Sequence, residues 1–306
     1  MTATSFRPDI QGLRAIHVGY LLLRNKQVLR SRHTIKGQAL RWGVLVAAIL
    51  GTSQCMAKIS VAFTPDQLPI EYRRYVDPKT ICHGKIVGDC LRGDLGSDKE
   101  VLVLGDSHAA MLNHFFDYLG QELNLKARII TAISCVTIPG FDYKRIAEWA
   151  QQPCLDQIER AHPYIEKAQT IFIAGVWNSQ TRARPFNLAL EEFFNSYRDK
   201  RIVILSQVPR FNRDVSRIQR FEKLCLPSHI ERDRSYQVAN RELAELAKSH
   251  TNVEFKALDS LNVFDQAPSH QGNLIYIDEH HINEVGARRY VKAAVNSFSI
   301  ASEDGK

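Results

Sequence analysis

From residue 101 onward, short aliphatic runs alternate with amphipathic stretches, and this alternation restricts the folds open to the chain. Runs typical of buried strands cover residues 101–104, 127–132, 170–176, 202–208 and 252–256. Stretches with helical periodicity follow them at residues 108–121, 155–168, 186–198, 232–249 and 284–298. The pattern predicts an α/β fold in which helices cover both faces of a parallel sheet. In such sheets, ligands bind beyond the carboxyl ends of the strands.

The net charge of the chain is concentrated at its N-terminus. Residues 1–41 hold eight lysines and arginines and one acidic residue, which accounts for the whole formal charge of +7. The rest of the chain has 32 basic and 32 acidic side chains and is neutral. The basic charge therefore gives no reason to expect nucleic acid as a partner of the main domain.

Residues 40–63 are predominantly apolar and follow the basic segment. Only apolar residues and glycine occur from Trp42 to Gly51, and Lys58 lies near the far end, where it can extend outward. The stretch predicts one transmembrane helix, and the basic flank places residues 1–39 in the cytoplasm. A cleaved signal peptide and a core or interfacial helix are the alternatives.

The rest of the chain divides into two parts. Residues 64–98 contain prolines, glycines and aspartates without sustained periodicity, and they predict a linker that packs onto the domain. Residues 99–306 form that domain.

Five of the six cysteines lie beyond the proposed transmembrane helix. Cys82 with Cys90, and Cys135 with Cys154, would close short loops in an oxidising compartment and leave Cys225 single. Buried free thiols in a cytosolic enzyme are the alternative. The sequence contains no CxxC pair, which argues against a zinc ribbon.

The sequence GDSH, residues 105–108, stands where the first strand ends and a helix begins. Gly105 permits a tight turn, and Asp106 can hydrogen-bond within the loop. Ser107 falls at the helix start, where unpaired backbone N–H groups can face an oxyanion. An ordinary helix cap is the alternative. His108 is expected to be a helix-start residue with no chemical role.

A second polar cluster, DEHH at residues 278–281, lies near the C-terminus. It follows an aliphatic run and precedes a helix that Asn283 is expected to cap. The spacing of Asp278 and His281 lets a carboxylate reach Nδ1 of the imidazole while Nε2 points outward, and a serine nucleophile needs such an oriented base. His280 is expected to face elsewhere. Two exposed loop histidines are the alternative.

GDSH followed by a C-terminal DxxH resembles the SGNH, or GDSL-type, serine hydrolases. The resemblance implies a flavodoxin-like three-layer α/β/α sandwich with a parallel sheet. It also implies Ser107 as nucleophile, His281 as general base and acid, and Asp278 as the residue that orients His281. For the oxyanion, it implies the backbone N–H of Ser107 together with Asn178, in the sequence AGVWNS at residues 174–179.

The sequence FRPDIQGLRAI at residues 6–16 resembles the start of the family-three membrane acyltransferases. Many of those proteins carry an SGNH domain after their last membrane helix, and the sequence ISC at residues 133–135 and Trp177 are similar to that subgroup. Most of the membrane acyltransferase body is missing from this chain, so residues 1–39 resemble a remnant of its first helix. The resemblance implies either an internally deleted relative or a product that works beside a separate membrane acyltransferase.

The resemblance implies transfer of acyl groups, usually acetyl, to hydroxyls of cell-envelope carbohydrate, or their removal, through an acyl-enzyme. The partners would be an acylated donor and an envelope glycan acceptor, with no cofactor and no metal. The chain would be a single-pass inner-membrane protein with a cytoplasmic N-terminus and a periplasmic SGNH domain.

Two other functions are compatible with the residues. A metal-dependent phosphoesterase would use Asp106, His108, Asp278, His280 and His281 as ligands. A vestigial or non-catalytic carbohydrate-binding domain is the second.

Overall fold

The computed structural model describes residues 70–73, 75, 79–216 and 230–298. They belong to one compact unit, which spans residues 65–222 and 227–306. The segment at 1–39, the predicted transmembrane helix at 40–63 and Cys225 lie outside the described residues. Among the described helices, none has the length and hydropathy needed to cross a membrane.

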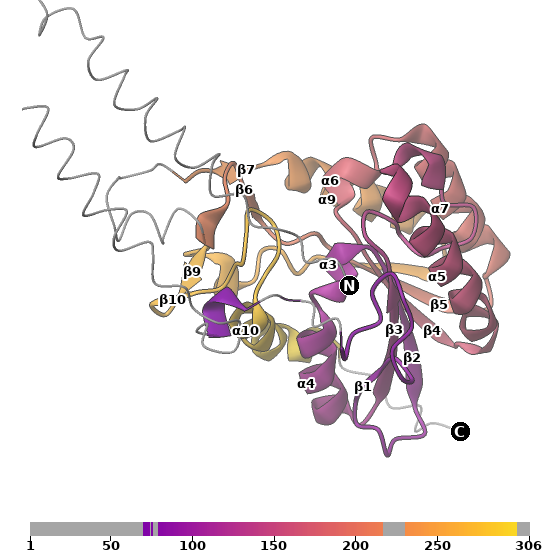
Figure 1. Cartoon of the computed structure of the whole chain (residues 1–306), viewed down its shortest axis with the longest axis horizontal. Helices are drawn as coiled ribbons and strands as arrows, with labels where there is room; N and C mark the ends of the chain where they lie inside the picture. Colours follow the sequence, from indigo (N-terminus) through magenta and orange to yellow (C-terminus); the bar gives the residue numbers. More distant parts are fainter. Residues whose placement is uncertain (1–69, 74, 76–78, 217–229, 299–306) are drawn as a thin grey trace, which may run out of the picture. The chain divides into compact units, whose positions relative to one another are not determined.

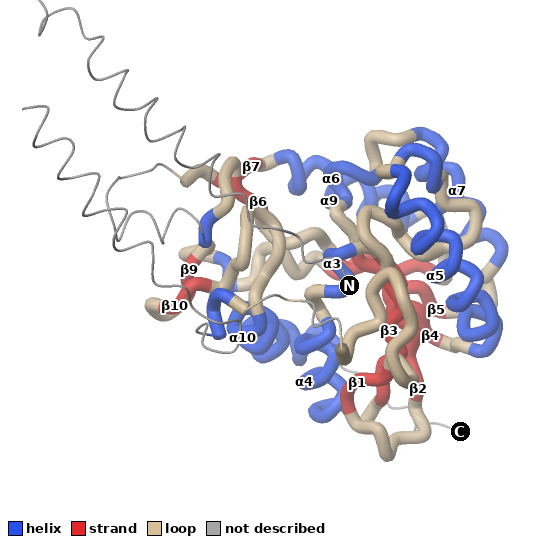
Figure 2. The backbone as a smooth tube through the Cα atoms, viewed as in Figure 1, coloured by secondary structure: helices blue, strands red, loops and turns tan. Residues whose placement is uncertain are grey.

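A six-stranded sheet forms the centre of the domain (Figures 1 and 2). Its strand order is β1-β3-β2-β4-β5-β8. The five parallel strands are β2 (Glu100–Gly105), β3 (Lys126–Thr131), β4 (Thr170–Ala174), β5 (Arg201–Leu205) and β8 (Val253–Lys256). Counted along the chain, these five strands have the flavodoxin-like order 2-1-3-4-5.

The sheet is mixed, whereas the sequence predicted a parallel one. Strand β1 (Leu91–Gly93) pairs antiparallel with β3 at the edge of the sheet. It lies in the predicted linker, and its three residues are too few to show any period-two pattern. The described part of the linker therefore packs onto the domain and also extends its sheet.

Helices cover both faces of the sheet, as predicted. Val101 and Val103 of β2 face α4 (Asn113–Leu123) and α10 (Glu284–Ala294). The alternate residues Leu102 and Leu104 face the opposite layer, formed by α5 (Glu148–Lys167), α7 (Arg184–Ser196) and α9 (Ser235–Lys248). Residues along a strand alternate between faces, so the unbroken aliphatic run of β2 supplies both cores.

Two predicted helices differ from the observed ones. The stretch at 108–121 divides into α3 (Ser107–Ala110) and α4, so the turn at Ser107 has its own short helix. Helix α5 begins earlier than predicted and contains Pro153, because the buried side chains of Ala150 and Cys154 anchor its first two turns.

The smaller elements lie in the connections. They are η3 (Ile70–Tyr72), η4 (Tyr143–Arg145), α6 (Trp177–Gln180), β6 (Arg210–Phe211), β7 (Arg232–Asp233), η5 (Asn262–Phe264), β9 (Ser269–His270), β10 (Asn273–Leu274) and η6 (Val295–Phe298).

Both predicted disulfides are present. Cys82 pairs with Cys90 and joins the segment before the sheet to the start of β1. Cys135 pairs with Cys154 and joins the loop after β3 to α5.

Candidate active site

Ser107 stands at the carboxyl end of β2, at the point where the strand order reverses. Gly105 ends the strand with a φ of +149°, and a Cβ built there would lie 1.9 Å from the carbonyl oxygen of Ala174 in β4. Only glycine fits this close approach of the two backbones. The chain then turns sharply, and Ser107 becomes the first residue of α3.

Asp106 is the N-cap of α3 and is fully buried. One carboxylate oxygen accepts from the backbone N–H of His108 at 2.8 Å, and the other from Val176 N–H at 3.0 Å and Gln180 Nε2 at 2.7 Å. Burial raises the pKa of Asp106 and outweighs these hydrogen bonds, which lower it. The side chain of Asp106 therefore fixes the turn at Ser107 against the turn after β4.

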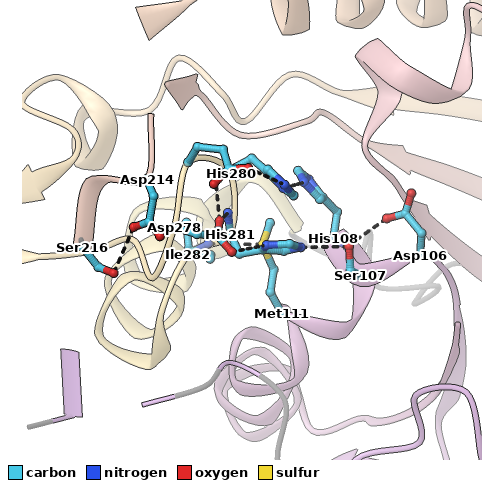
Figure 3. Close-up of polar contacts among 11 residues, drawn as sticks. Asp106, Ser107, His108, Met111, Asp214, Ser216, Asp278, His280, His281 and Ile282 are labelled. Carbon is cyan, nitrogen blue, oxygen red and sulfur yellow. Dashed lines mark hydrogen bonds and ion pairs between the residues drawn. The ribbon is translucent and has the colours of Figure 1, made fainter. Parts of the chain in front are cut away.

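His281 reaches Ser107 from the loop that precedes α10 (Figure 3). Its Nε2 lies 2.8 Å from Ser107 Oγ, and its Nδ1 lies 2.7 Å from Asp278 Oδ2. The structure thus brings together the three residues that the sequence proposed as a triad.

Asp278 is held by its own loop. Its Oδ1 accepts from the backbone N–H groups of His280 at 2.9 Å and His281 at 2.7 Å. Burial alone would raise the pKa of Asp278, but the hydrogen bond and charge of His281 lower it to about 2. Asp278 is therefore a carboxylate near neutral pH, which favours a proton on Nδ1 of His281 and leaves Nε2 to accept one.

The prediction that His280 faces away from this site is wrong. Its ring centroid lies 4.0 Å from that of His281, and its Nδ1 lies 2.9 Å from Nε2 of His108 (Figure 3). Burial lowers the pKa of His280 to about 4 and that of His108 well below the ordinary value. Both rings are therefore neutral near pH 7, and one donates its single N–H to the other.

The proton arrangement of this pair follows from its surroundings. His280 Nε2 lies 3.7 Å from a carboxylate oxygen of Glu279, which favours a proton on that nitrogen. His280 Nδ1 then accepts from His108 Nε2–H. His108 Nδ1 is buried and has no hydrogen-bond partner among the described residues, so it carries a lone pair and not a proton.

Three histidines near the triad are close enough to hold a metal ion. One ring nitrogen each from His108, His280 and His281 lies within 4.8 Å of the others. Binding through His108 Nε2 would require a proton on the partnerless His108 Nδ1, and binding through His281 Nε2 would break its contact with Ser107. The hydrogen-bonded arrangement of these residues thus fits acid–base chemistry better than metal binding.

Tyr75 is a contact that the sequence did not indicate. Its ring stacks on His281 with centroids 4.2 Å apart and an angle of 17° between planes. It comes from the segment ahead of the sheet, whose irregular sequence gives no sign of where its side chains lie.

Asn178, the predicted oxyanion donor, lies buried in α6. Its Nδ2 donates to Ser235 Oγ at 2.8 Å, and its Oδ1 accepts from Gln207 Nε2 at 3.0 Å. Among the hydrogen bonds of the described residues, none joins Asn178 to Ser107. One amide hydrogen is thus already committed, and its role as an oxyanion donor stays a prediction.

Several solved structures are similar to this chain, including the following two. The periplasmic domain of a lipopolysaccharide acetyltransferase from Salmonella ser. Paratyphi A is 14% identical, with a TM-score of 0.47, over 71% of this chain and 90% of that one. A Streptococcus pneumonia protein assigned as a platelet activating factor is 19% identical, with a TM-score of 0.38, over 66% and 85%. No curated protein sequence matches the chain.

A family model gives a broader match. It covers residues 75–295, from Tyr75 through α10, and it describes an SGNH domain fused to AT3 domains. The match includes the turn that carries Ser107 and the loop that carries Asp278 and His281. The chain therefore belongs to the SGNH domain family whose members are fused to AT3 domains.

Proposed function

We propose that this protein transfers acyl groups to, or removes them from, hydroxyls of cell-envelope carbohydrate, and that the acyl group is acetyl. The observation that carries the proposal is the hydrogen-bonded series from Ser107 Oγ through His281 to Asp278, at 2.8 and 2.7 Å. A nucleophile, a base and a residue that orients the base are the parts that a covalent acyl mechanism requires.

The reaction begins with attack of Ser107 Oγ on the carbonyl carbon of the acyl donor, while His281 Nε2 takes the hydroxyl proton. The tetrahedral intermediate collapses, and His281 returns the proton to the departing alcohol. An acceptor hydroxyl then attacks the acyl-serine while His281 takes its proton, and His281 returns that proton to Ser107 Oγ as the acylated acceptor departs. Water in place of that hydroxyl gives hydrolysis, so exclusion of water decides between transferase and esterase.

The oxyanion needs hydrogen-bond donors beside Ser107. The backbone N–H of Ser107 stands at the first position of α3, where no carbonyl of the same helix can accept from it. It is therefore our first proposed donor. The uncommitted second hydrogen of Asn178 Nδ2 is our second.

The two disulfides support an extracytoplasmic location, because such bonds persist in oxidising compartments. Together with the predicted transmembrane helix at 40–63, they support a periplasmic domain on a single-pass inner-membrane protein. The family's fusion to AT3 domains supports a membrane acyltransferase as the partner that supplies the acyl group.

Covalent labelling with a fluorophosphonate tests the nucleophile. We expect an adduct on the wild type and none on Ser107→Ala, while Ser196→Ala on the exposed surface of α7 labels like the wild type. A wild type that does not label, or a Ser107→Ala protein that does, would contradict the assignment. Labelling that survives a chelator would argue against the metal-dependent phosphoesterase.

Release of acetate from p-nitrophenyl acetate separates the two reactions. With an added envelope oligosaccharide, a transferase forms the acetylated sugar in proportion to the p-nitrophenol released, whereas an esterase forms free acetate. Binding of the oligosaccharide without turnover of either kind would favour the non-catalytic carbohydrate-binding domain.

A further inference from the structure

The imidazole of His281 lies between two other rings. Tyr75 stacks on it at 4.2 Å with nearly parallel planes, and His280 contacts it at 4.0 Å with a tilt of 46°. His280 is itself fixed by its hydrogen bond to His108. The ring that accepts the proton in the proposed reaction therefore has aromatic neighbours in addition to its hydrogen bonds.

We propose that Tyr75 is a positioning residue for His281, and that the face of its ring stabilises the imidazolium that forms when Ser107 loses its proton. The face of an aromatic ring carries partial negative charge and attracts a cation within about 6 Å of its centroid. At 4.2 Å and 17° the two rings lie face to face, so a positive charge on His281 would spread directly over the tyrosine.

The other titratable groups around His281 do not account for all of the stabilisation that an imidazolium needs, so the tyrosine ring can add to it. Those that face it and can carry charge are Asp278 in its own loop, the neighbouring His280, His83 near β3, and Asp106 and His108 at the start of α3. Asp278 is ionised, whereas burial keeps the three histidines neutral at pH 7. Burial also raises the pKa of Asp106, so this carboxyl group is ionised to a smaller extent than an exposed one.

The segment that carries Tyr75 is attached to the same loop as His281. The backbone carbonyl of Glu71 accepts from Asn283 Nδ2 at 3.0 Å. Asn283 is fully buried, lies two residues after His281 and caps α10 through a bond from Gly286 N–H at 2.8 Å. Asn283 therefore connects the segment of Tyr75 to the loop of His281 and helps to hold the two rings against each other.

The test compares Tyr75→Phe with Tyr75→Leu. Phenylalanine keeps the aromatic face, while leucine keeps a smaller apolar cover and removes the face. Protonation of the His281 ring is followed by NMR in histidine-labelled protein, with the His281 signal assigned by its loss in His281→Gln. The rate of fluorophosphonate labelling is measured over the same pH range.

We expect Tyr75→Leu to lower the protonation midpoint of the His281 ring by about 0.5 to 1 pH unit. The acid limb of the labelling rate should move to lower pH by the same amount, and the plateau rate should fall. Tyr75→Phe should match the wild type in both measurements. Tyr164→Leu is the control, because Tyr164 lies on α5, packs against Arg128 of β3 and makes no ring contact with His281 among the described residues.

Two outcomes would overturn the inference. One is an unchanged midpoint in Tyr75→Leu, and the other is an equal shift in both variants, which would assign the effect to the hydroxyl. The significance of the imidazolium in catalysis rests on the proposed function, but the NMR titration does not. If the wild type fails to label while the midpoint still shifts in Tyr75→Leu, the proposed function fails and the ring interaction stands.

Discussion

At the scale of single residues, Asp278 and its neighbour Glu279 are adjacent carboxylates that contact different histidines. Asp278 Oδ2 accepts from His281 Nδ1, whereas the side chain of Glu279 lies 3.7 Å from His280 and outside the triad. Replacing each acid in turn therefore tests which of the two carboxylates orients His281.

We predict that Asp278→Asn lowers the rate of p-nitrophenyl acetate turnover by about a thousand-fold or more, because an amide favours the wrong tautomer of His281. Glu279→Gln should change that rate by less than about tenfold, since it leaves the triad intact. Initial rates at saturating substrate give the comparison. Comparable losses in both variants would show that general loop disorder, and not orientation of the base, is responsible.

The sequence indicated the triad residues better than their surroundings. A serine after a strand and a DxxH before a helix have recognisable spacing, and the structure brings those side chains together. The contacts of His280 and Tyr75 have no such spacing. His280 packs beside His108 across 172 residues of sequence, and Tyr75 precedes His281 from an irregular segment. Contacts of this kind depend on the finished fold.

At the scale of elements, one close approach holds β1 and α4 together. Gly120 of α4 lies against Gly93 of β1, and a Cβ built on Gly120 would lie 2.5 Å from the Cα of Gly93 and 2.5 Å from the carbonyl oxygen of Leu125. Both neighbours are backbone atoms, so neither can rotate away.

We predict that Gly120→Ala lowers the free energy of unfolding by about 1 to 3 kcal/mol, because the helix must move away from the edge strand. Urea unfolding followed by tryptophan fluorescence measures the loss. Gly96→Ala is the control, since its nearest neighbour is the flexible side chain of Asp94 at 3.4 Å, and it should change stability by less than about 0.5 kcal/mol. A fully stable Gly120→Ala protein would contradict this packing argument.

Strands with long aliphatic runs were predicted to within a few residues, and the edge strand was missed. After their exposed first residues, β2 and β5 are buried on both faces, so their aliphatic residues form an unbroken hydrophobic signal. β1 contains only Leu91, Arg92 and Gly93. Its pairing with β3 comes from backbone hydrogen bonds, which the identity of the side chains does not reveal.

At the scale of the whole molecule, buried histidines make stability depend on pH. Burial lowers the pKa of His83 and of His280 to about 4, and that of His108 well below 6.5. Between pH 6.5 and 4 the unfolded chain binds protons that the folded chain does not, so stability falls as pH falls. Asp106 acts in the opposite direction, because its raised pKa lets the folded state bind a proton first.

We predict a lower urea midpoint at pH 5 than at pH 7.5, with His83 alone responsible for about 2 kcal/mol of the loss. His83→Gln should remove that part of the pH dependence while the protein remains folded at pH 7.5. Equal midpoints for the wild type at the two pH values would show that these rings gain protons without unfolding the domain.

Ser107 and His281 are 174 residues apart in the sequence, so they cannot meet until the later of the two has been made. For much of translation, Ser107 has already been made and His281 has not. Until His281 is made, Ser107 is an alcohol without the base that we propose for it. The hydrogen bond between the two residues forms only when the loop that precedes α10 packs against the turn at Ser107.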